Sequence, residues 1–81
     1  MTKDKLNETF NKCLDENCGV WIAYARLGHS DYEIVIVHPN DVLTKLNEII
    51  DIIDDDCIID DNTVISHCGK LKETDFFFQL N

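Results

Sequence analysis

Residues that could carry chemistry are concentrated between positions 41 and 61. This segment of 21 residues holds eight carboxylates against one base, Lys45, and so accounts for a formal charge of −7 out of the chain's −9. Apolar residues are interleaved with the acids, so the segment can fold and present its charge in a fixed pattern. Such a surface attracts basic surfaces and repels nucleic acid and anionic lipid. The candidate partner-binding residues are Asp41, Glu48, Asp51, Asp54, Asp55, Asp56, Asp60 and Asp61.

The acids also have a purely structural interpretation, in which they solvate the outer face of an amphipathic helix. Against it stand Asp54, Asp55 and Asp56, which we expect at or just beyond the C-terminus of that helix. The helix dipole is negative at that end and disfavours carboxylates, and Asp60 and Asp61 add further repulsion. We therefore expect a local cost in stability that is tolerated because the cluster binds a partner.

Metal binding and catalysis have weaker support. The run DDDCIIDDN offers oxygen ligands but lacks the glycine and the spacing of a calcium loop. The spacing of Cys13 and Cys18, and the adjacent pair His67 and Cys68, fit no closed zinc module. No nucleophile signature surrounds a cysteine, so we expect free thiols, no metal, no cofactor and no enzymatic activity. Whether the acidic cluster binds a divalent cation stays open at this stage.

Composition and length predict a single small acidic domain spanning residues 1–81. The chain is 44% apolar and 28% charged, with three glycines and one proline, which is typical of a globular protein. Seven bases and a net charge of −9 disfavour direct contact with nucleic acid. No apolar run has the length of a signal peptide or a membrane span, so we expect a cytoplasmic protein with no membrane contact.

Apolar periodicity predicts two helices and several strands. Residues 3–17 form a first helix with Thr2 as its cap, and residues 20–27 and 31–37 form an antiparallel hairpin that turns at Gly28. A second helix begins after Asn40 or Asp41, with apolar positions 42, 43, 46, 49, 50 and 53. On its opposite side the spacing predicts an exposed ridge made by Asp41, Thr44, Glu48, Asp51 and Asp55. Short strands are expected at 57–59, 62–68 and 75–80.

These elements predict an α+β fold. Two amphipathic helices pack on one face of a mainly antiparallel sheet of four or five strands, in the order α-β-β-α-β-β with one optional extra short strand. A circularly permuted split β-α-β arrangement is one possible topology. The first two strands are apolar on both sides, so the sheet keeps an apolar face and a homodimer is possible. Possible interface aromatics are Trp21, Tyr24, Tyr32 and Phe77.

In size and charge the chain resembles the small acidic inhibitor proteins of phages and mobile elements, which include anti-CRISPR proteins, anti-restriction proteins and DNA mimics. The resemblance implies that carboxylates of residues 41–61 take the places of phosphates in a basic channel of a defence nuclease, such as a CRISPR effector or a restriction enzyme, in a bacterial host cell. Alternatives are an immunity protein that covers a basic toxin and an adaptor that works as a dimer.

Overall fold

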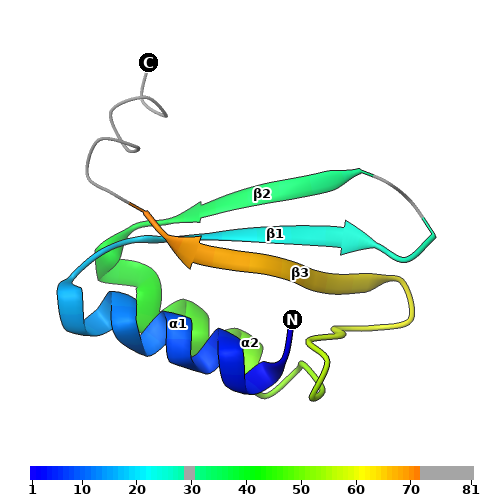
Figure 1. Ribbon diagram of the computed structural model, residues 1–81, viewed down its shortest axis with the longest axis horizontal. Coiled ribbons are helices and arrows are strands. Elements are labelled where there is room, and N and C mark those ends of the chain that lie inside the picture. The colour runs from blue at the N-terminus through cyan, green and yellow to red at the C-terminus, as the bar shows by residue number, and fades with distance from the viewer. Residues whose placement is uncertain (29–30, 72–81) are drawn as a thin grey trace.

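The computed structural model describes residues 1–28 and 31–71 (Figure 1). Two helices and a three-stranded antiparallel sheet make up the regular structure of this part of the chain, which confirms the α+β class. A 3-10 turn, η1, leads into the second helix. In chain order the elements are α1 (Lys3–Glu16), β1 (Val20–Arg26), β2 (Tyr32–Val37), η1 (Pro39–Asp41), α2 (Val42–Ile50) and β3 (Thr63–Lys70).

Helix α1 begins and ends where its sequence predicts. The Thr2 hydroxyl accepts a hydrogen bond from the Lys5 amide at 3.2 Å, which satisfies one of the free amides of the first turn. At the other end Asn17 adopts the left-handed conformation, with φ 53°, and its amide bonds back to the carbonyls of Cys13 and Leu14. The helix buries one side, made by Leu6, Phe10 and Cys13.

The strand order is β2-β1-β3, with both neighbouring pairs antiparallel. Strands β2 and β3 therefore run parallel to each other on either side of β1, and the chain passes between them through α2. This is a split β-α-β arrangement. The expected strand at 57–59 forms only an isolated bridge, between Ile58 and Val64. The expected strand at 75–80 lies outside the described residues.

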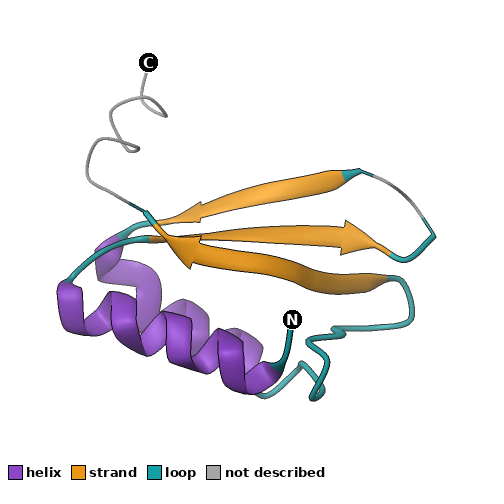
Figure 2. Ribbon diagram, in the orientation of Figure 1, coloured by secondary structure: helices purple, strands orange, loops and turns teal. Residues whose placement is uncertain are grey.

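Both helices lie on the same face of the sheet (Figures 1 and 2). The core fills the space between these two layers, and every helix and strand contributes to it. Cys57, in the loop after α2, also belongs to the core. The largest fully buried side chains of the core are Leu6, Phe10, Cys13, Val20, Ile22, Val42, Cys57 and Ile65.

Helix α2 is shorter than its apolar pattern predicts. The pattern extends to position 53, whereas the regular helix ends at Ile50. The amides of Ile52 and Ile53 both bond to the Ile49 carbonyl, and Ile53 still reaches the core. Beyond it the Asp54 carboxylate accepts backbone amides, which gives the chain an alternative to further helical hydrogen bonds. The predicted ridge is therefore wrong at its far end, and Asp55 lies in the following loop.

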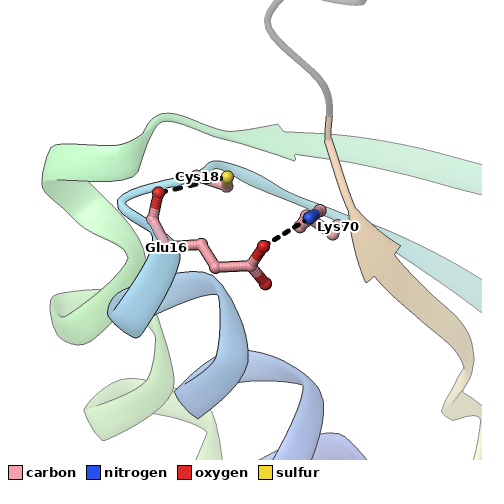
Figure 3. Close-up of polar contacts among 3 residues, drawn as sticks. All are labelled: Glu16, Cys18 and Lys70. Atoms are coloured by element: carbon pink, nitrogen blue, oxygen red, sulfur yellow. Dashed lines mark hydrogen bonds and ion pairs between the residues drawn. The ribbon is translucent and has the colours of Figure 1, made fainter.

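An exposed ion pair links the end of α1 to the end of β3 (Figure 3). The Lys70 ammonium donates to a Glu16 carboxylate oxygen at 2.7 Å, and the Cys18 thiol donates to the Glu16 carbonyl at 3.4 Å. The hydrogen bond from Lys70 lowers the pKa of Glu16, and the same contact raises the pKa of Lys70. Helix and sheet are thus joined at the edge of the core by polar contacts.

Candidate functional site

All eight candidate carboxylates are exposed to solvent. The structure divides them among three short stretches. Asp41, Glu48 and Asp51 belong to α2 and its two ends, Asp54, Asp55 and Asp56 belong to the next loop, and Asp60 and Asp61 precede β3. We call residues 41–61 the acidic segment. It reaches from α2 through the loop that leads into β3. In Figure 1 it runs from the helix layer below the sheet through the loop at the lower right.

The carboxylates of α2 border a groove beside the edge of the sheet. The groove has a volume of about 340 Å³ and runs between strand β2 and helix α2. Glu48 is paired with Lys45 at 3.7 Å, an exposed contact of small energetic value. Among the described residues, no strand pairs with the outer edge of β2. The groove is lined by Val35, Ile36, Val37, His38, Asp41, Thr44, Lys45 and Glu48.

Asp54 has a structural task. One of its carboxylate oxygens accepts the amides of Asp56 and Ile58, each at 2.9 Å, and its carbonyl accepts the amide of Cys57 at 3.0 Å. These bonds form a tight turn in which Cys57 has φ 62° and is fully buried. The Asp60 carboxylate acts similarly, accepting the Asn62 amide at 2.8 Å. Asp54 and Asp60 therefore also help to fold the loop, a role that the sequence analysis did not assign to them.

The N-terminus of α1 further offsets the charge of the loop. The Lys3 amide donates to the Asp55 carbonyl at 2.9 Å, and the Lys3 ammonium donates to the Ile53 carbonyl at 3.4 Å. The positive end of the α1 dipole thus meets the loop that carries Asp54, Asp55 and Asp56. From the sequence only the unfavourable dipole of α2 was considered, because the docking of α1 is a tertiary contact.

The remaining acids have no such structural task. Among the described residues, no side-chain hydrogen bond or ion pair involves the carboxylates of Asp41, Asp51, Asp55, Asp56 or Asp61. A rigid backbone therefore carries several carboxylates that are free to contact another molecule.

The second candidate surface is the face of the sheet opposite the helices. Ile22 points to the core, so its neighbours Trp21 and Ala23 point to the other face. The register adds the residues that lie opposite these positions on the two outer strands. We call this set the open face. It consists of Trp21, Ala23, Ala25, Tyr32, Ile34, Ile36, Val64, His67 and Gly69.

Several side chains of the open face pack closely against one another. The indole of Trp21 lies against Gly69, where an added Cβ would come within 2.6 Å of the indole nitrogen. The rings of Tyr32 and His67 stack with centroids 6.4 Å apart and planes at 28°. These two residues belong to the outer strands, and β1 lies between them, with only alanines at 23 and 25. The two rings therefore meet over β1, and Ala23 beneath them is only 4% exposed.

The candidate interface aromatics are split by the structure. Trp21 and Tyr32 lie on the open face, whereas Tyr24 packs against the core on the helix side. Phe77 lies outside the described residues. The sequence analysis did not select Ile34, Ile36 or His67 as interface residues. The alternation of the β2 segment contained the signal for the two isoleucines, whereas the register that brings His67 to Tyr32 involves strands distant in sequence.

Three of the four cysteines lie in or against the core: Cys13 and Cys57 are part of it, and Cys68 packs against it. Burial raises the pKa of Cys13 and of Cys57, and raises that of Cys68 to about 11, so these side chains stay protonated at neutral pH. All four are free. Within residues 1–28 and 31–71, no three His, Cys, Asp or Glu side chains are grouped so that they could hold a metal ion.

No family model, curated protein or solved structure matches the chain. Its residues and geometry are therefore the basis for a functional proposal. In the described ranges, no helix has both the length and the apolar character needed to cross a membrane.

Proposed function

We propose that this protein is a non-enzymatic binding protein whose acidic segment contacts a basic surface of another protein. One observation carries the proposal: eight exposed carboxylates lie within 21 residues of a chain whose backbone in that region is held by hydrogen bonds. A fixed array of charge loses less conformational freedom on binding than a disordered acidic tail does.

The partner we propose is a basic nucleic-acid-binding channel of a defence nuclease, such as a CRISPR effector or a restriction enzyme. Carboxylates would take the places of phosphates there and block entry of the substrate. The groove beside β2 supports a protein partner in particular, because it combines Asp41 and Glu48 with the apolar edge of a strand. Electrostatic attraction would speed encounter, and the apolar edge would add close contact.

The same surface is compatible with a second candidate function. An immunity protein that covers a basic toxin, or a dimeric adaptor, would use the same carboxylates against a different basic protein. For either function we propose a cytoplasmic location and no metal, cofactor or nucleic acid bound directly.

The test is inhibition of DNA cleavage by purified CRISPR effectors and restriction enzymes. A double variant, Glu48→Lys with Asp51→Lys, should weaken inhibition at least tenfold, because it removes two contacts and adds two repulsions. The matched control is Glu8→Lys with Asp15→Lys on α1, two acids that are also exposed. Each substitution raises the formal charge by two, so both variants carry −5 in place of −9.

Equal losses in the two variants would contradict a defined acidic site and indicate a non-specific effect of net charge. Failure to inhibit any nuclease, with tight binding to a basic toxin instead, would favour the immunity protein. Wild-type inhibition should also weaken as salt rises from 0.05 to 0.5 M, about a threefold shortening of the Debye length.

A further inference from the structure

The open face of the sheet carries no formal charge. None of its nine positions holds Asp, Glu, Lys or Arg, although 28% of the chain is charged. Glu33 and Arg26, the charged residues of the hairpin strands, occupy the alternate positions of their strands. An antiparallel sheet with one face in water normally places polar residues there. The two hairpin strands depart from this pattern, whereas β3 contributes the exposed polar residue His67.

Two of its large side chains are more than half exposed. Tyr32 is 58% and Ile34 is 55% exposed, while Trp21, Ile36 and Val64 are half-buried next to them. In the part of the chain that the structure describes, no helix or strand covers this face (Figures 1 and 2). A continuous apolar patch of this kind on a small protein marks a contact surface.

We propose that a second copy of this chain covers the open face, sheet against sheet, about a twofold axis. Matching of charge supports this occupant. Burying a charge against this uncharged face would be costly, which favours an uncharged cover, and the face itself is such a surface. A twofold axis brings the same residues together from both copies.

Each chain has a net charge of −9, but this arrangement keeps the acidic helices of the two copies far apart. Packed sheets lie about 10 Å apart, and each helix layer lies roughly 10 Å behind its own sheet. The α2 carboxylates of the two copies would then be about 30 Å apart, which is more than three Debye lengths at physiological salt. Packing through the helix side would instead bring the acidic segments together.

The size of the face sets the expected strength. Three strands of about seven residues cover a footprint of roughly 340 Å² on each copy. Even with the larger accessible surface of its side chains, the contact lies at the low end of specific interfaces. We therefore expect a reversible dimer that forms at high micromolar concentration.

The chain contains its own probe for this contact. Trp21 is the single tryptophan, and it lies half-buried on the open face. Between about 10 and 500 µM the mass from sedimentation should rise from 9.3 kDa toward twice that value. Over the same range the Trp21 emission should shift to the blue and become harder to quench with acrylamide.

A pair of matched variants tests the location. Ile34→Lys places a charge midway along β2, within the proposed contact, and should weaken association at least tenfold. Leu43→Lys makes the same change at a residue of α2 that is 54% exposed and should leave association unchanged. A second variant on the open face, Tyr32→Lys, should act like Ile34→Lys. Circular dichroism would check that each variant is folded.

Three results would overturn the proposal. The first is a wild type that stays monomeric at 500 µM. The second is equal effects of Ile34→Lys and Leu43→Lys on association. The third is a monomer in which Trp21 is already protected from acrylamide. The last would mean that other residues of the same chain cover the face. The open face contains no residue of the acidic segment. Glu48→Lys with Asp51→Lys should therefore leave the dimer intact.

Discussion

The acidic segment and the open face are two exposed surfaces that differ in charge. The acidic segment concentrates charge on α2 and the loop after it, where two of its own carboxylates, Asp54 and Asp60, accept backbone amides. The open face excludes charge from three strands and leaves tyrosine and isoleucine side chains more than half exposed. Charge acts at a distance and is screened by salt, whereas apolar contact acts only at close range and is not. The two surfaces can therefore be told apart by ionic strength alone.

The difference also separates two roles that carboxylates have here. Asp54 and Asp60 bond to backbone amides, so part of the negative charge is needed to fold the loop. Among the described residues, the carboxylates of Asp55, Asp56 and Asp61 accept no backbone amide, and these are the acids of the loop that are free for a partner.

The largest expected effect is on the free energy of unfolding. It comes from truncating an isoleucine on each of the two faces of the sheet. Ile22→Ala removes a fully buried side chain beneath the helices and should lower the free energy of unfolding by about 2–5 kcal/mol. Ile34→Ala, on the open face, should lower it by less than about 1 kcal/mol in dilute monomer. Urea unfolding at low micromolar concentration measures both. Similar losses would show that the open face is covered within one chain.

A second prediction concerns the packing of Trp21 on β3. In Gly69→Ala the new Cβ would lie 2.6–2.7 Å from the indole ring, so the ring must move off the strand. We expect a loss of about 1–3 kcal/mol in unfolding free energy, together with a red shift of the Trp21 emission. An unchanged emission spectrum would mean that the indole does not rest on Gly69 in solution.

A third comparison tests the two roles of carboxylates within the acidic segment. Asp54→Ala leaves two backbone amides without their acceptor and should cost about 1–2 kcal/mol of stability. Asp55→Ala removes the same charge one residue later and should change stability by less than about 0.5 kcal/mol. Thermal unfolding of the two variants gives the difference, and equal midpoints would refute the structural role of Asp54.

The smallest effect is the pH dependence of the Glu16–Lys70 pair (Figure 3). The pKa of Glu16 is lower in the folded protein than its ordinary value of 4.5. The pair therefore stabilises the fold above pH 4.5, and this contribution is lost as pH falls through the folded pKa. Wild type should be slightly more stable than Glu16→Gln at pH 7, and the difference should shrink as the pH falls below 4.5 and through the folded pKa. A direct check is that Lys70→Met raises the Glu16 pKa in an NMR titration.

Local patterns in the sequence determined much of this architecture. Thr2 and Asn17 set the ends of α1 because caps act through neighbouring backbone groups. The hairpin strands lie within one residue of their expected ends, since alternation and the turn at Gly28 are local signals. The acidic character of residues 41–61 and the existence of an apolar sheet face were also evident, because each depends only on residue type and period.

Tertiary structure decided what these residues do. The length of α2 depended on the competing hydrogen bonds of Asp54, and the tolerance of the acidic loop depended on α1, whose N-terminus is about 50 residues away in sequence. The register that opposes Tyr24 to Glu33 and Ile65 puts this tyrosine on the helix side, while Tyr32 and His67 meet on the open face. Sequence periodicity assigns residues to faces of one strand. Which face is buried, and which distant residues share it, is fixed only when the layers pack.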